Sequence, residues 1–255
     1  MPDSAPRTLV VIPTYCEKEN ITDLVGRVRA AVPAAHVLIV DDNSPDGTGQ
    51  IADGLADGDP HIQVLHRTVK DGLGRAYVAG FTRALDEGFT RVVEMDADGS
   101  HQPEQIPLLL AAVDKGADVA IGTRWMPGGS VVNWPLRRQL ISRVGTAYAR
   151  IMLHSPLRDV TSGFRAFRAS ALTSVDLGAF RGMGYVFQIE MVWRAQQAGL
   201  TVVEVPITFI ERVAGASKMS FAIAWEAMVQ ITRWGVAGVG RKSPQTWSAP
   251  NSAAR

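Results

Sequence analysis

Two aspartates separated by one residue, Asp96 and Asp98, directly follow an apolar run at residues 91–95. Such a run is typical of a buried strand, in which the side chains at positions i and i+2 point to the same side. Two carboxylates on one side offer hard oxygen ligands to Mg²⁺ or Mn²⁺, with waters and phosphate oxygens in the remaining positions. A lone Asp-x-Asp is more often an exposed acidic turn, so the prediction of a metal site depends on the rest of the chain.

The elements around this pair alternate between strand and helix patterns. We predict strands at residues 8–12, 36–40, 62–66, 91–95 and 117–122. Helical spacing follows the first strand from residue 21, and further helices are predicted from about residue 48, at 74–87 and at 103–115. Short elements in this order predict an α/β fold, with a mostly parallel, doubly wound sheet and helices on both faces.

Polar residues cluster at the ends of four predicted strands. They are Pro13, Tyr15 and Glu17 after the first, Asp41 and Asp42 after the second, Asp96 and Asp98 after the fourth, and Arg124 after the fifth. The carboxyl ends of parallel strands meet at one edge of the sheet, where ligands bind in open α/β folds. This clustering favours a site for a metal and a nucleotide over a chance acidic turn.

Two other nucleotide signatures are incomplete. Gly72 and Gly74 begin a G-x-G-x-x-G pattern, but Tyr77 stands at its third glycine position and the segment does not follow the first strand, which argues against a dinucleotide cofactor. The chain has no G-x-x-x-x-G-K-[ST] sequence, so a P-loop is not expected.

Composition excludes several classes of protein. A chain of 255 residues with 46% apolar and 20% charged residues can bury one large core. The formal net charge of +1 argues against general nucleic-acid binding. The single cysteine cannot form an internal disulfide, and the N-terminus lacks the features of a signal peptide, so we expect a cytoplasmic location. We find no uncharged apolar run of about 18 residues, the length of a bilayer span.

Five motifs in order carry a resemblance to a known family. They are residues 10–20, 40–48, 95–98, 122–124 and 159–165. Together, over about residues 7–220, they resemble family 2 glycosyltransferases of the GT-A fold, and within that family the polyprenol-phosphate (dolichol-phosphate) mannose synthases. The resemblance implies a Rossmann-like GT-A fold and a metal-dependent, inverting enzyme of the dolichyl-phosphate β-D-mannosyltransferase type. Its donor would be GDP-mannose and its acceptor a polyprenyl phosphate.

Matched position by position, the resemblance also assigns the donor site. Residues holding the guanosine half of GDP-mannose would be Pro13, Tyr15, Glu17, Val40 and Asp42. Residues holding the metal (Mg²⁺ or Mn²⁺) and the diphosphate would be Asp96, Ala97 and Asp98, with Arg124 also near the donor. Ser100 matches a position where some relatives supply glutamine as a metal ligand, and Cys16 stands where asparagine is common.

Cations are needed where the diphosphate leaves, because breaking the bond to the sugar places negative charge on it. Arg212 and Lys218 flank a Gly-Ala-Ser stretch and are our candidates. The alternative interpretation is a pair of solvated surface cations.

The resemblance assigns the acceptor's phosphate to Arg124, Arg138 and Ser142. A phosphate monoester is already largely ionised at neutral pH and needs no general base. Asp159 therefore stays a catalytic candidate beside Asp98, Arg124 and Arg138, but as a residue that orients arginines or the acceptor, or else has a structural role in its turn.

Two segments favour contact with a membrane. Residues 134–154 contain four arginines, no acid and an apolar stripe at helical spacing, which fits a basic amphipathic helix at an anionic surface or, alternatively, a helix packed on the core. Residues 219–240 form a second amphipathic helix facing a membrane or a partner, with Trp225 and Trp234 as expected interfacial anchors.

The sequence therefore divides into a catalytic domain at residues 1–218, the helix at 219–240 and a disordered tail at 241–255. We expect peripheral association with the cytoplasmic face of the membrane, with a membrane-spanning protein as an alternative partner and no nucleic acid. Two alternatives remain for the function. One is the same chemistry with UDP-glucose or another nucleotide sugar, and the other is a non-catalytic protein that binds a nucleotide sugar.

Overall fold

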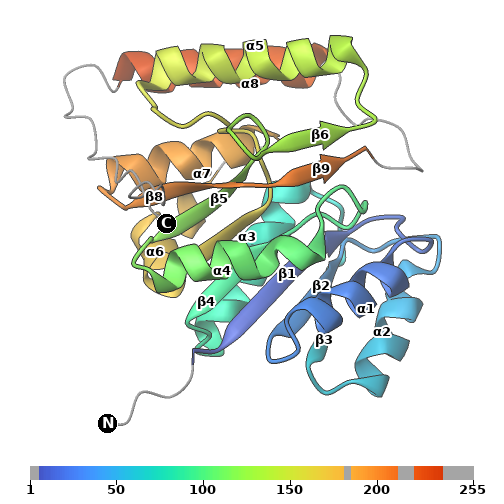
Figure 1. Ribbon diagram of the computed structural model, residues 1–255. Coiled ribbons are helices and arrows are strands. Elements are labelled where there is room, and N and C mark those ends of the chain that lie inside the picture. Colours follow the sequence, from blue (N-terminus) through green and yellow to red (C-terminus); the bar gives the residue numbers. More distant parts are fainter. Residues whose placement is uncertain (1–5, 181–184, 212–220, 238–255) are drawn as a thin grey trace, which may run out of the picture.

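The computed structural model describes residues 6–180, 185–211 and 221–237. Its main sheet has seven strands in the order β3-β2-β1-β4-β7-β5-β8 (Figure 1). Their bounds are β1 Thr8–Thr14, β2 His36–Asp41, β3 Ile62–His66, β4 Arg91–Glu94, β5 Val119–Thr123, β7 Arg165–Arg168 and β8 Val202–Pro206. Only β7 runs antiparallel to its neighbours, β4 and β5. The predicted α/β class and the mostly parallel sheet are confirmed.

Strand β1 shows why the predicted strands are continuous apolar runs. Leu9 and Val11 belong to one buried cluster and Val10 and Ile12 to another, so alternate side chains fill the cores on opposite faces of the sheet. Helices cover both faces (Figure 1). One face carries α1 Ile21–Ala31, α2 Thr48–Gly58 and α4 Ile106–Asp114, which follows the short 3₁₀ turn η1 Pro103–Gln105. The other carries α3 Leu73–Asp86, α6 Ala169–Ser174, η2 Leu177–Ala179 and α7 Tyr185–Gln197.

Strand β7 is absent from the sequence-based prediction. It is four residues long and begins with Arg165, which is fully buried. A charged side chain in a short central strand removes the apolar run by which the other strands are recognised. By inserting between β4 and β5, β7 separates the strand that ends before Asp96 from the strand that ends before Arg124.

A further layer lies above the sheet. Helices α5 Leu136–Leu153 and α8 Phe221–Ala237 run side by side at the top of Figure 1, and the two-stranded sheet of β6 Ser130–Val132 and β9 Thr208–Ile210 lies beneath them. A Cβ atom at Gly235 would collide with the carbonyl oxygen of Met152, so only glycine allows α8 to approach α5 this closely. Among the described residues, no helix combines the length and the apolar character that crossing a membrane requires.

Candidate functional site

The predicted guanosine residues lie together at the carboxyl ends of β1 and β2. Pro13 and Val40 are partners in the register of these strands, and both are buried. The amide of Asp42 donates to the carbonyl oxygen of Thr14 at 3.1 Å, a hydrogen bond that holds the end of β2 beside the end of β1. The structure therefore brings these predicted donor residues to one edge of the sheet.

The carboxylate of Asp42 is held by a cation that the sequence analysis missed. Nη1 of Arg67 donates to Oδ1 of Asp42 at 2.6 Å. Burial raises the pKa of Asp42, and the Arg67 guanidinium opposes that shift. Arg67 directly follows β3, so the rule that polar residues at strand ends form the site could have found it.

Tyr15 and Glu17 lie in the loop after β1. The ammonium of Lys70 sits 3.5 Å from the centre of the Tyr15 ring, a cation–π contact. Oε2 of Glu17 accepts from Nδ2 of Asn20 at 2.9 Å, and the amide of Glu17 donates to Oγ1 of Thr48 at the same distance. Lys70 is therefore, after Arg67, a second basic residue near the predicted guanosine-binding residues, and the sequence analysis missed it.

The predicted metal ligands follow β4. Asp96 and Asp98 are half-buried, and the amide of Ser100 donates to Oδ1 of Asp98 at 3.0 Å, which folds the turn around that carboxylate. Within residues 6–180, 185–211 and 221–237 there is no group of three His, Cys, Asp or Glu side chains placed to hold a metal. Two carboxylates and a hydroxyl nevertheless fit Mg²⁺ or Mn²⁺, because Mg²⁺ usually takes only one or two carboxylates from a protein and fills its shell with water and phosphate.

Buried polar groups contact the end of β4 and the turn that follows it. Nδ1 of His101 accepts from the amide of Asp96 at 3.1 Å, and burial lowers the pKa of His101, which favours the neutral imidazole that this bond needs. Burial raises the pKa of Glu94 to about 8, although Arg165 opposes the shift. Nε2 of Gln188 donates to Oε1 of Glu94. None of these groups was predicted.

Arg124, one of the predicted acceptor residues, forms a buried ion pair with Asp159. Nε of Arg124 donates to Oδ2 of Asp159 at 2.6 Å and Nη2 donates to Oδ1 at 2.7 Å. The side chains are 8% and 0% exposed. Nη2 of Arg124 also donates to Oγ1 of Thr161 at 3.0 Å. Of the roles that the sequence left open for Asp159, this geometry fits that of orienting an arginine.

Asp159 is held in turn by Glu204 on β8. Oε1 of Glu204 accepts from the amides of Arg158 at 2.7 Å and Asp159 at 3.2 Å, and from Oγ1 of Thr123 at 2.9 Å. Burial raises the pKa of Glu204. One carboxylate on β8 therefore fixes the loop that supports Arg124.

Trp134 brings the two predicted acceptor arginines together. The centre of its ring lies 5.3 Å from the Arg124 guanidinium carbon and 4.5 Å from that of Arg138. Arg138 and Ser142 are half-buried and one turn apart on α5, which places them on one face of that helix. Nη1 of Arg138 also pairs with the Glu211 carboxylate. Arg212 and Lys218, the predicted leaving-group cations, lie outside the described residues.

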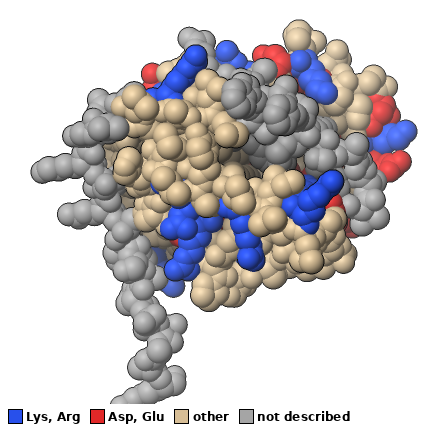
Figure 2. Space-filling model, turned by 90° about the horizontal axis from the view of Figure 1, so that it is seen from above, with Lys and Arg blue, Asp and Glu red and all other residues tan. Residues whose placement is uncertain are grey.

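The two sides of α5 differ in exposure. Its outer side exposes large apolar side chains, with Leu136 82%, Leu140 64% and Ile151 73% accessible. Thr146, Ala149 and Leu153 on its inner side are buried. The helix therefore packs on the protein through one side and presents an apolar stripe on the other. Figure 2, which views the molecule from above, shows a largely uncharged surface bordered by Lys and Arg, with acidic side chains near its margin.

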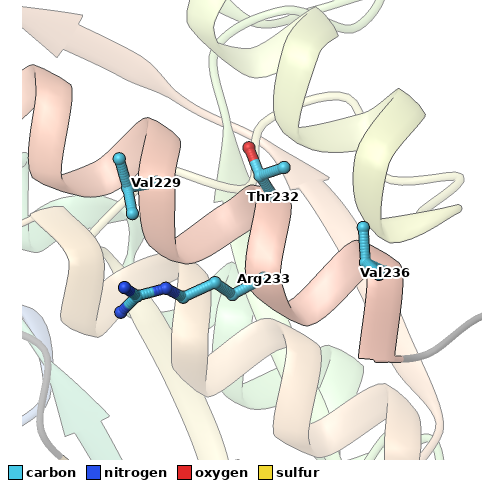
Figure 3. A pocket seen from close by; sticks show the side chains of 4 residues that line it. All are labelled: Val229, Thr232, Arg233 and Val236. Atoms are coloured by element: carbon cyan, nitrogen blue, oxygen red, sulfur yellow. The ribbon is translucent and has the colours of Figure 1, made fainter.

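Helix α8 carries the two tryptophans predicted as interfacial anchors. The half-buried ring of Trp234 stacks on Trp193 of α7, with centroids 5.4 Å apart. The Trp225 side chain lies outside the described part of the chain. A pocket of about 490 Å³ lies against α8, lined by Val229, Thr232, Arg233 and Val236 (Figure 3). None of these lining residues belongs to the strand ends that carry the candidate site.

Known proteins resemble this chain over most of its length. It is 54% identical over 233 residues to the polyprenol monophosphomannose synthase of Mycolicibacterium smegmatis, covering 91% of this chain and 88% of that protein. It is 55% identical over 231 residues to the undecaprenyl-phosphate mannosyltransferase of Micrococcus luteus, covering 91% and 95%.

A solved structure shares the fold. Glucosyl-3-phosphoglycerate synthase from Mycobacterium tuberculosis, in complex with Mn²⁺, UDP-glucose and phosphoglyceric acid, matches with a TM-score of 0.66 at 17% identity, covering 91% of this chain and 80% of that one. The family model described as glycosyl transferase family 2 matches residues 9–175. The resemblance carried by the motifs is thereby confirmed, and the chain belongs to glycosyl transferase family 2.

Proposed function

We propose that this chain transfers mannose, with inversion at the anomeric carbon, from GDP-mannose to a polyprenyl phosphate. The observation that carries the proposal is the meeting of Arg124 and Arg138 on the Trp134 ring, at the sheet edge that also presents Asp96 and Asp98. One site then has cations for the acceptor phosphate and carboxylates for the donor's metal. The names of the two mannosyltransferase relatives support the same sugar and the same class of lipid.

The protein's main task in this reaction is to position two phosphate groups. Arg124, fixed by Asp159, and Arg138 direct the acceptor phosphate so that one of its oxygens faces the anomeric carbon. Glu211 pairs with Arg138, so an incoming phosphate displaces that carboxylate or shares the guanidinium, whose five N–H donors allow both. The ionised phosphate attacks directly, and no side chain has to remove a proton.

On the donor side, Asp42 and Tyr15 would hold the guanosine while Asp96, Asp98 and Ser100 would hold Mg²⁺ or Mn²⁺. When bound, the ion neutralises charge that develops on the departing diphosphate. Arg212 and Lys218 are proposed to add positive charge at the same place. Residues 1–218 carry this chemistry in our proposal, while 219–240 faces a membrane or a partner. The tail proposed at 241–255 lies outside the described residues.

Acceptor chemistry gives the test of this proposal. The purified chain, incubated with radiolabelled GDP-mannose and Mg²⁺, should form a mannolipid with polyprenyl phosphate but not with the corresponding polyprenol, because the arginines bind an anion and the alcohol offers them none. Equal transfer to the polyprenol would contradict the proposed role of Arg124 and Arg138.

The two sides of the site should respond separately to mutation. Arg138→Ala should raise the KM for the lipid phosphate about tenfold or more, since a charge-assisted contact to phosphate contributes about 1.5–3 kcal/mol. Its affinity for GDP, measured by calorimetry, should change little. Arg212→Ala and Lys218→Ala should instead weaken GDP binding. If Arg138→Ala loses GDP affinity as severely as Arg212→Ala does, the division into donor and acceptor sides is wrong.

We further propose that α5 places the site at an anionic membrane surface. Arg137, Arg143 and Arg150 are exposed on a helix without acidic residues, beside its exposed apolar face. Each cation near such a surface contributes about 1 kcal/mol, an attraction that salt screens. The chain should therefore sediment with anionic liposomes at low salt and be partly released at high salt. Replacing these three arginines by glutamine should weaken binding, and Arg138 is kept because of its proposed role in catalysis.

A control variant, matched to the α5 variant in charge, removes three exposed cations from a part of the protein away from α5. Arg7 precedes β1, Arg83 lies near the end of α3, and Lys115 follows α4. Changing these three residues to glutamine as well lowers the net charge by the same amount but should leave liposome binding unchanged. If the α5 variant binds like the unmodified chain, or if both triple variants lose binding equally, α5 is not the membrane-docking element.

A further inference from the structure

Tyr77 joins helix α3 to the first of the two aspartates. It lies in the second turn of α3 and is 0% exposed. Its hydroxyl donates to Oδ1 of Asp96 at 2.8 Å, across 19 positions in the sequence. This is the residue that occupies the third glycine position of the incomplete G-x-G-x-x-G pattern.

The ring of Tyr77 is held by aromatic neighbours. It is nearly parallel to Phe187 of α7, with centroids 5.9 Å apart and 6° between the planes. It also stacks on Phe81 of α3 at 5.7 Å. These contacts restrain the ring, so its hydroxyl stays directed at Asp96.

Asp96 is thus fixed at two atoms. Its amide donates to His101 Nδ1 at 3.1 Å, and its carboxylate accepts from Tyr77. The imidazole is itself fixed by stacking on Phe164, with centroids 5.1 Å apart. A carboxylate restrained in this way keeps one orientation, whereas an unrestrained half-buried aspartate would sample several rotamers.

We propose that Tyr77 is a positioning residue for the metal site, which holds the Asp96 carboxylate in the orientation that binds the divalent cation. The inference rests on the proposed function, because it assumes that Asp96 and Asp98 bind the ion. Partners of metal ligands orient those ligands, and their loss typically lowers metal affinity by roughly 10–100-fold. Tyr77 acts through Asp96 and does not itself touch the substrate.

Tyr77→Phe is the informative variant, because it removes the hydroxyl and keeps the stacked ring. Titration of Mn²⁺ in the presence of GDP, followed by electron paramagnetic resonance, should show roughly 10–100-fold weaker binding. The affinity for GDP without metal and the thermal unfolding midpoint should change little, which separates a positioning role from a purely structural one. Tyr148→Phe is the matched control, since the Tyr148 hydroxyl bonds to Thr232 between α5 and α8 and its loss should leave Mn²⁺ affinity unchanged.

A third variant separates the two possible failures. Asp98→Ala removes a proposed ligand and should abolish measurable Mn²⁺ binding. If Asp98→Ala loses Mn²⁺ binding while Tyr77→Phe stays within about twofold of the unmodified chain, Tyr77 has no positioning role and the inference is overturned. If Asp98→Ala itself binds Mn²⁺ like the unmodified chain, the metal assignment fails.

Discussion

Replacing Asp98 by alanine should lower kcat/KM for mannosyl transfer at least about 100-fold. The substitution removes an anionic oxygen ligand and leaves the charge of the departing diphosphate poorly neutralised. Losing one preorganised electrostatic contact of this kind costs roughly 3 kcal/mol or more of transition-state stabilisation. Initial rates at subsaturating donor measure the effect, and excess EDTA should abolish activity in the unmodified chain.

Asp86→Ala provides the comparison for Asp98→Ala. Asp86 is exposed at the far end of α3, so its loss should leave kcat/KM unchanged. Turnover of Asp98→Ala close to that of Asp86→Ala, or full activity in excess EDTA, would rule out the metal assignment.

Replacing Asp159 by alanine should lower the free energy of unfolding by about 3–5 kcal/mol, because removal of one partner of a buried ion pair leaves the other charge uncompensated. Arg124 would remain almost fully buried without its bidentate acceptor. Denaturant unfolding measures the change, and the KM for the lipid phosphate should rise in the same variant because Arg124 loses its fixed orientation.

Asp114→Ala tests whether burial is the cause of that loss. Asp114 accepts two hydrogen bonds from Nη1 of Arg91, but its side chain is 53% exposed. Exposed ion pairs contribute about 0–1 kcal/mol. Equal destabilisation by Asp159→Ala and Asp114→Ala would show that the Arg124 pair has no special structural role.

The sequence predicts the part of the site that follows parallel strands. Pro13, Asp41 and Asp42 could be grouped because such strands end at one edge, and the β1–β2 register places Pro13 and Asp41 there. Arg67 falls under the same rule and was overlooked. The turn after β4 was predictable for the same reason, because Asp96 and Asp98 directly follow an apolar run.

Contacts made across the fold could not be predicted in this way. Arg138 meets Glu211 from 73 positions away, and Trp134 joins two arginines whose common neighbour no periodicity indicates. In the sequence, Tyr77 was notable only because it occupies the third glycine position of the incomplete G-x-G-x-x-G pattern. Trp234 stacks on Trp193 of α7, a contact between two helices that the spacing within one helix does not show.

Cys16 shows how structure can explain a departure from the family motif. Its φ of 59° lies in the left-handed region, which asparagine tolerates better than other non-glycine residues. The asparagine common at this position therefore fits the backbone, and cysteine maintains the same turn at an energetic cost.

The most direct measurement compares donors. The purified chain is incubated with one polyprenyl phosphate, Mg²⁺ and, in parallel, GDP-mannose, UDP-glucose or UDP-galactose, each radiolabelled in the sugar, and the labelled lipid is counted. We expect rapid formation of a mannolipid from GDP-mannose and little product from either UDP-sugar. Preferential transfer from a UDP-sugar, or no lipid product from any donor, would contradict the assignment as a mannosyltransferase to polyprenyl phosphate.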